Sequence, residues 1–114
     1  MIKTIVTMVK TYLNGDAACF VCWDRESNIA EEYLPSDPAR RWKAEVSLVD
    51  DTLTIIVPWD ERHIFDDKEH CPFQLNAKIQ IESNGTVWFK GVETCATGEC
   101  EANVYVLADS HTLI

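Results

Sequence analysis

Hydrophobic and polar residues alternate along most of the chain in short segments rich in β-branched residues. A period of two residues is that of a β-strand with one buried face, and the Gly, Asn, Asp and Ser between such segments favour tight turns. The segments recur about every ten residues, a spacing typical of all-β folds. Residues 1–114 are therefore predicted to form one mainly β domain, with about eight antiparallel strands in a meander that forms a barrel or a two-sheet sandwich.

The strongest hairpin signal lies in residues 42–59. With Asp50-Asp51 as a two-residue loop, every cross-strand pair on one side is apolar. A shift of one residue would turn this whole set outward, so the register is well specified. We expect strands over residues 43–49 and 52–58, with the inner pairs Leu48–Leu53, Val46–Ile55, Ala44–Val57 and Trp42–Trp59.

A second hairpin is predicted in residues 75–91. A two-residue Asn84-Gly85 turn would mix apolar and polar residues on each face. A three-residue loop that begins at Ser83 keeps them apart, with the glycine in the left-handed position of a bulge. This register points Trp88 outward and gives the inner pairs Ile81–Val87 and Ile79–Phe89.

The N-terminal segment is ambiguous between helix and strand. Residues 2–9 have apolar residues at helical spacing, but most are β-branched, and the strong hairpin turn Asn14-Gly15 follows. We favour a strand; the alternative is an α+β fold with an N-terminal helix on an antiparallel sheet. Residues 17–23 are apolar on both faces, which predicts a central strand or a subunit contact. Further strands are expected at residues 29–34 and 102–108.

Two long connections are expected to hold one or two short helices. Residues 35–42 can form a helical turn, because Pro38 suits the first helical position. Residues 59–71 read W-D-E-R-H-I-F-D-D-K-E-H-C, where Asp60 can cap a helix that ends before Pro72. Loops of this length without structure of their own are often functional.

A metal site is one interpretation of this charged connection. On a helix His63, Asp67 and His70 share a face, and two His with one Asp can bind a divalent metal. The same helix would bury Ile64 and Phe65 and leave both histidines in solvent, without the surroundings that orient metal ligands. A solvated connector is preferred, so no cofactor is predicted, with a divalent metal as the alternative.

The cysteines give little support for a disulfide framework, because their number, five, is odd. Cys19 and Cys22 would point to opposite faces of a strand, so we interpret them as buried apolar residues. A disulfide between Cys95 and Cys100, or a share in a zinc site, stays open. The N-terminus lacks the apolar core of a signal peptide, so the cytoplasm and reduced thiols are expected.

Nineteen acidic and ten basic residues give a net charge of −9. This negative charge opposes direct binding to nucleic acid. The chain also has no basic stretch that could neutralise phosphates and release their counterions. No membrane contact is expected either, since no segment is long and apolar enough to cross a bilayer. A basic protein partner fits the charge, so residues 60–69 and 93–101 could act as an acidic mimic that inhibits a nucleic-acid-binding protein.

Catalytic signals are weak. The chain has no G-x-S-x-G motif and no glycine-rich phosphate loop. The carboxylates of Glu31, Glu32, Asp60 and Glu61 could meet in a cleft, so a small metal-dependent or acid–base enzyme is a second alternative. Whether the chain is an enzyme stays open, with the weight on the side of binding.

Aromatic residues give the most useful functional signal. The predicted pairing sets Trp42 beside Trp59 at the open end of a hairpin, with Tyr33 and Phe65 in flanking segments. A barrel mouth lined by these four residues could hold a small apolar ligand, although the same side chains could simply plug the core.

A second group of apolar residues is predicted on the outer surface, where such patches mark subunit or partner contacts. It comprises Trp88, Trp23 and Val92, with Val6 and Met8 as possible additions. The sequence therefore predicts a non-enzymatic binding protein, with a small apolar ligand in the barrel mouth or a protein partner on the aromatic face. A homodimer is also expected.

Overall fold

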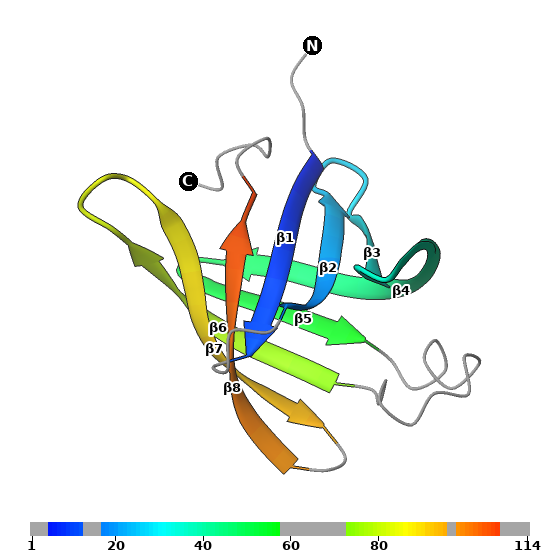
Figure 1. The fold of residues 1–114 in the computed structure, drawn as a ribbon. Coiled ribbons are helices and arrows are strands. Elements are labelled where there is room, and N and C mark those ends of the chain that lie inside the picture. Colours follow the sequence, from blue (N-terminus) through cyan, green and yellow to red (C-terminus); the bar gives the residue numbers. More distant parts are fainter. Residues whose placement is uncertain (1–4, 13–16, 58–72, 96–97, 108–114) are drawn as a thin grey trace.

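The computed structural model describes residues 5–12, 17–57, 73–95 and 98–107. Within them the chain forms eight strands, each antiparallel to the next, and the last pairs with the first to close a barrel (Figure 1). The strands are β1 (Ile5–Tyr12), β2 (Ala17–Asp24), β3 (Ile29–Leu34), β4 (Asp37–Val49), β5 (Thr52–Val57), β6 (Phe73–Ile81), β7 (Val87–Cys95) and β8 (Gly98–Val106). The predicted meander is confirmed, and it closes as a barrel.

Both predicted hairpins have the expected register. β4 and β5 pair from Glu45–Ile56 to Val49–Thr52, and Asp50 in the turn has a φ of 56°. β6 and β7 are joined by the predicted loop, with Gly85 at a φ of 89°, so a left-handed residue closes the turn. The inner pairs are Leu48–Leu53, Val46–Ile55 and Ile79–Phe89. Ile81 pairs with Val87 as predicted, but its side chain is 59% exposed and lies beyond the core.

The helical turn expected in residues 35–42 is wrong. β4 begins at Asp37, and Arg41 and Trp42 pair with Tyr33 and Glu32 of β3. Pairing with β3 outweighs the local signal for a helix N-cap. A proline has no backbone N–H to donate, and near the start of a strand this disturbs the ladder of hydrogen bonds little. The described residues contain no helix.

The N-terminal segment is a strand, so the alternative with an N-terminal helix is wrong. β1 pairs with β2 on one side and with β8 on the other, and β2 lies between β1 and β3 as its apolar composition predicted. In Figure 1, β1 and β2 cross in front of β4 and β5, so the strands enclose one interior.

The barrel interior is the hydrophobic core. Residues of alternate positions on every strand point inward, as closure of a small barrel requires. The largest fully buried apolar side chains are Phe89, Met8, Leu53, Ile55, Leu75, Val6, Val21, Val57 and Val104.

Three residues of the predicted outer patch lie in this core instead. Val6 and Met8 are fully buried and Trp23 is 6% exposed. Because β1 and β2 are apolar on both faces, alternation alone cannot say which face turns inward. The pairing of β1 with β8 and of β2 with β3 sets which face of each strand turns inward. The prediction that Val6, Met8 and Trp23 form an outer patch is therefore wrong.

Candidate functional site

Three ionisable side chains lie in the apolar interior of the barrel. Lys10, Glu32 and Glu93 are 2%, 1% and 4% exposed. We call these three residues the interior charged cluster. A buried ion is costly unless it is paired and hydrogen-bonded, and hydrophobic residues of similar volume usually stabilise a core as well or better. The cluster is therefore the feature of this barrel that packing alone explains least.

The cluster lies near one rim of the barrel. Lys10, Glu32 and Glu93 each stand two positions before the end of their strand, on β1, β3 and β7. Odd-numbered strands end at this rim and even-numbered strands begin there, as the antiparallel order requires. Cys19 and Cys100 stand two positions after the start of β2 and β8. The three charged residues and the buried thiol of Cys19 therefore lie toward this rim, and the exposed Cys100 lies beside them.

Two of the charges form a direct ion pair. The ammonium of Lys10 donates a hydrogen bond to Oε1 of Glu93, and both groups are buried. The other carboxylate oxygen of Glu93, Oε2, lies 3.7 Å from the thiol of Cys100, which is directly opposite it on β8. Glu93 therefore joins strands β1, β7 and β8 through one side chain.

The electrostatic environment of Lys10 favours its charged form. Burial acts most strongly, and it lowers the pKa of this ammonium. The nearby groups of Cys19, Glu32 and Glu93, with the hydrogen bond to Glu93, outweigh that effect and raise the pKa above 10.5. Lys10 is therefore a fixed positive charge at neutral pH.

Irregular strand pairing occurs at the same rim. The register of β1 against β2 shifts between Lys10 and Thr11, and that of β3 against β4 shifts between Tyr33 and Leu34. An extra residue on one strand redirects side chains, and such bulges are frequent at barrel rims and beside functional sites. One shift follows Lys10 directly, and the other lies one residue beyond Glu32.

Trp42 lies inside the barrel beside this cluster, directly opposite Glu32 across β3 and β4. It is 4% exposed, so it belongs to the interior wall and is not an open lining of the mouth. The predicted partner of Trp42 at the rim, Trp59, and the predicted ligand residue Phe65 lie outside the described residues.

Tyr33 does not share the interior with Trp42. Its ring stacks on Phe20 at 5.5 Å on the outer surface, and the guanidinium of Arg41 lies 4.2 Å from its centroid. Neighbouring positions on a strand point to opposite faces, so Tyr33 and Glu32 are separated by the sheet. The same rule separates Glu31 from Glu32, two acids expected to meet in a cleft.

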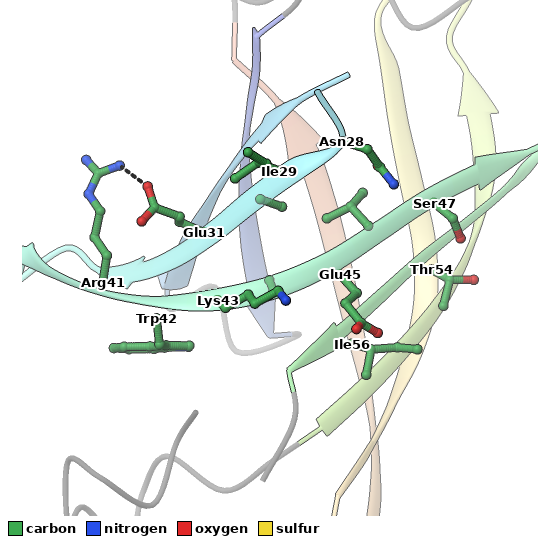
Figure 2. Close-up of a pocket in the computed structure, with 13 residues that line it drawn as sticks. Asn28, Ile29, Glu31, Arg41, Trp42, Lys43, Glu45, Ser47, Thr54 and Ile56 are labelled. Atoms are coloured by element: carbon green, nitrogen blue, oxygen red, sulfur yellow. Dashed lines mark ion pairs between the residues drawn. The ribbon is translucent and has the colours of Figure 1, made fainter. Parts of the chain in front are cut away.

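A groove of about 910 Å³ lies on the outer surface over β3, β4 and β5. Glu31, Arg41, Lys43 and Glu45 contribute to its walls, and Arg41 Nη1 lies 3.9 Å from Glu31 Oε1. Figure 2 shows Trp42 on the other side of β4 from this ion pair. Exposed pairs of this kind contribute little, and the mixed charges select no class of ligand.

The outer aromatic face is smaller than predicted. Trp88 stacks on Tyr105 at 5.7 Å, and its indole N–H donates a hydrogen bond of 2.8 Å to Glu82. Val92 is 41% exposed on the same strand as Trp88, as expected, whereas Trp23 is in the core. This face retains two aromatic residues and one valine.

The remaining candidates find no support in the described residues. His63, Asp67 and His70 lie outside them, and within them no group of three His, Cys, Asp or Glu side chains could hold a metal ion. Cys100 carries a thiol and is not in a disulfide. Among the described residues there is also no helix long and apolar enough to cross a membrane.

Sequence reasoning missed the cluster as a unit. Lys10 follows Val6 and Met8 at intervals of two, Glu32 follows Ala30, and Glu93 follows Phe89 and Gly91. Each charge therefore stands in the inward phase of its strand. That phase was an available signal for Glu32 and Glu93, but not for Lys10, because β1 is apolar on both faces. The acidic-mimic interpretation of residues 93–101 also loses Glu93, which is buried.

Comparisons of the chain with protein-family models, with curated proteins and with solved structures found no match. The geometry defines the class of molecule: a closed, eight-stranded antiparallel β-barrel with an ionic cluster in its interior near one rim. Functional reasoning rests on that arrangement.

Proposed function

We propose that this protein binds a small molecule, mainly apolar and with one polar group, in the barrel interior beside the interior charged cluster. The observation that carries the proposal is the burial of Lys10, Glu32 and Glu93 in an otherwise apolar interior. Ligand sites combine apolar walls with a few polar groups that fix orientation, and barrels of eight strands are either filled by side chains or hold one small ligand.

The stability of the fold does not explain why the interior charged cluster is present. Apolar side chains at these three positions would continue the core formed by Phe89, Met8 and their neighbours. Retaining charges there costs desolvation energy that an apolar core avoids. A binding role supplies a reason for that cost, since the charges orient a ligand that enters near the rim.

Binding is favoured over catalysis by the state of Lys10. A lysine that acts as a base or as a nucleophile needs a lowered pKa, because only the neutral amine reacts. The neighbours of Lys10 raise its pKa instead. The cluster is therefore suited to hold a polar group in place.

The test is an NMR titration of the full chain with three probes of equal length: hexan-1-ol, hexylammonium and hexanoate. The indole N–H signals of Trp42 and Trp88 serve as reporters of the interior and the outer face, each assigned with a Trp→Phe variant. We expect saturable shifts of the Trp42 signal with at least one probe and an unchanged Trp88 signal. No saturable shift with any probe, or shifts confined to Trp88, would overturn the proposal.

A second candidate is a protein contact, including a homodimer, on the face of Trp88, Tyr105 and Val92. It is supported by the stacked aromatic pair and by 38% and 41% exposure of Tyr105 and Val92. Native mass spectrometry gives the subunit number. A dimer that Trp88→Ser dissociates and Tyr33→Ser does not would support this contact, and a monomer at micromolar concentration would count against the homodimer.

We also propose a cytoplasmic location. The thiols of Cys19, Cys22 and Cys100 support it, because reduced cysteines are usual in that compartment. Cell fractionation of the tagged chain tests it, and recovery outside the cytoplasm would reject it.

A further inference from the structure

We propose that the outer face of β6, β7 and β8 binds a second copy of this chain, in a two-fold dimer where Lys90 of each copy meets Glu101 of the other. This inference rests on the second candidate function, a protein contact at Trp88, Tyr105 and Val92, and it names the partner and its orientation. It is independent of the interior ligand site. Three features of the face support it: the order of its outward residues, the surroundings of Lys90 and the symmetry of a dimer.

The outward residues of this face lie in rows across the three strands, which are consecutive in the barrel wall (Figure 1). Counted from the end that holds the β6–β7 turn, the four rows are Gln80–Trp88–Tyr105, Lys78–Lys90–Asn103, Asn76–Val92–Glu101 and Gln74–Thr94–Glu99. Successive outward positions on one strand are about 7 Å apart. The aromatic residues therefore lie at one end of the face, the lysines in the second row and the glutamates in the third and fourth rows.

Lys90 is exposed in this face beside a charge of its own sign. Lys78 lies directly opposite it on β6, and like charges at such positions repel each other. Lys78 has Asp51 at 3.4 Å, whereas no carboxylate of the described residues forms an ion pair with Lys90. On β8, Glu99 and Glu101 are exposed and likewise form no ion pair within the described part of the chain. The face therefore presents charges of both signs in separate rows.

A two-fold axis perpendicular to the strands brings these opposite charges together. When two copies of one sheet pack face to face, the axis lies between them, and each contact occurs twice. An axis that crosses β7 between Lys90 and Val92 sets the second row of one copy over the third row of the other. Lys90 then lies over the partner's Val92 and beside the partner's Glu101. Packed sheets are about 10 Å apart, a gap that a lysine and a glutamate side chain span together.

Other partners and orientations match this pattern less well. A purely basic or purely acidic partner would complement only one of the two signs, and an axis parallel to the strands would set Lys90 against the partner's Lys90. The net charge of −9 on each copy opposes association, but salt screens charges more than about 8 Å apart, so the close pairs decide. Tyr105 and Val92, 38% and 41% exposed, add apolar area that the partner covers.

The test measures the dissociation constant of the dimer by sedimentation velocity of the full chain at physiological ionic strength. Lys90→Glu and Glu101→Lys each place like charges together twice in a dimer, so each should weaken the homodimer at least about tenfold. An equimolar mixture of the two variants should form the heterodimer in preference to either homodimer, because both contacts then join opposite charges. Native mass spectrometry with one variant isotope-labelled separates the three dimers.

A double variant and a control pair separate this contact from net charge and from misfolding. Lys90→Glu combined with Glu101→Lys exchanges the two signs and should regain the homodimer. Lys43→Glu and Glu45→Lys, at exposed positions of β4, change the net charge by the same amounts and should leave the dissociation constant unchanged. Urea unfolding shows that each variant is folded.

Each failure points to a different part of the proposal. A dimer that Lys90→Glu does not weaken, or weakens only as much as Lys43→Glu does, would overturn the pairing of Lys90 with Glu101 while the aromatic contact stands. Single variants that form no heterodimer when mixed would do the same. A chain that is monomeric at micromolar concentration would overturn both the contact and its orientation. The interior ligand site has its own readout, the indole signal of Trp42, and none of these outcomes affects it.

Discussion

Lys10 on β1 and Glu93 on β7 form an ion pair inside the barrel across the intervening strand β8, although they are 83 positions apart in the chain. The pair links the first strand to the last hairpin at the seam where the barrel closes. Because it is buried, the loss of one partner leaves the other charge in a medium that solvates it poorly.

The two partners should differ in their effect on stability. Lys10→Met leaves two carboxylates without the ammonium and should cost about 3–5 kcal/mol. Glu93→Gln leaves Lys10 near Glu32 and should cost less, about 1–3 kcal/mol. Urea unfolding followed by tryptophan fluorescence measures both. Glu31→Gln, on the exposed face, should change the unfolding free energy by no more than about 0.5 kcal/mol, and a larger cost for Glu93→Gln than for Lys10→Met would contradict the charge balance.

Alkaline pH should remove the contribution of Lys10. Its pKa is raised in the folded protein, so this stabilisation is complete below 10.5 and is lost as the pH rises through the folded-state pKa. The difference in unfolding free energy between the original chain and Lys10→Met should be constant from about pH 7 to 10 and shrink above 10.5. A Cys19→Ala background removes the nearby thiol, and a difference that shrinks below pH 10 would contradict the raised pKa.

The parts of the fold that the sequence predicted well are those whose two faces differ in polarity. Alternation specified the register of β4 with β5 and of β6 with β7, because a one-residue shift would expose their apolar residues. β1 and β2 are apolar on both faces, and there the same rule could not tell Trp23 from an outward residue. Their orientation depends on closure between β1 and β8, which joins distant parts of the chain.

The candidate site was less accessible to prediction for a related reason. A charged residue within a strand is usually solvent-facing, and only the phase of its apolar neighbours shows that it points inward. Glu93 could be found that way, from Phe89. Lys10 could not, because β1 is apolar on both faces. The pairing of Lys10 with Glu93 was not predictable either, since no local pattern states which distant strands meet.

Gly91 marks a close approach between β6 and β7. A Cβ at this position would lie 2.5 Å from the carbonyl oxygen of Asn76 and 2.6 Å from Cβ of Ala77. Gly91→Ala should therefore force the strands apart and cost about 1–3 kcal/mol, measured by thermal or urea unfolding. Ala77→Gly in the same chain should restore part of this loss, because it removes one of the three contacts; the carbonyl oxygen of Asn76 and Cα of Ala77, the latter at 2.9 Å, remain.

Gly85 provides the contrasting control. No atom lies within 4 Å of a Cβ built there, but its φ of 89° is unfavourable for other residues. Gly85→Asn should be tolerated better than Gly85→Ala, because asparagine adopts left-handed conformations more readily. If Gly91→Ala leaves the unfolding free energy unchanged, the close packing of β6 on β7 is contradicted.

The thiol of Cys100 reports on the charge of Glu93. It is exposed and lies 3.7 Å from Oε2 of that carboxylate, which disfavours a neighbouring thiolate and accepts a hydrogen bond from the thiol. Glu93→Gln should therefore speed alkylation of Cys100 by N-ethylmaleimide several-fold at neutral pH. Peptide mass spectrometry separates Cys100 from the other cysteines.

Two internal references distinguish this effect from loosening of the barrel. Cys19 is buried in the interior, so it should stay unmodified in both chains, and Cys22 is half-buried on the outer face of β2, so its rate should stay the same. A uniform increase for all three cysteines would instead indicate local unfolding, and an unchanged alkylation rate of Cys100 would show that its contact with Glu93 does not control this thiol.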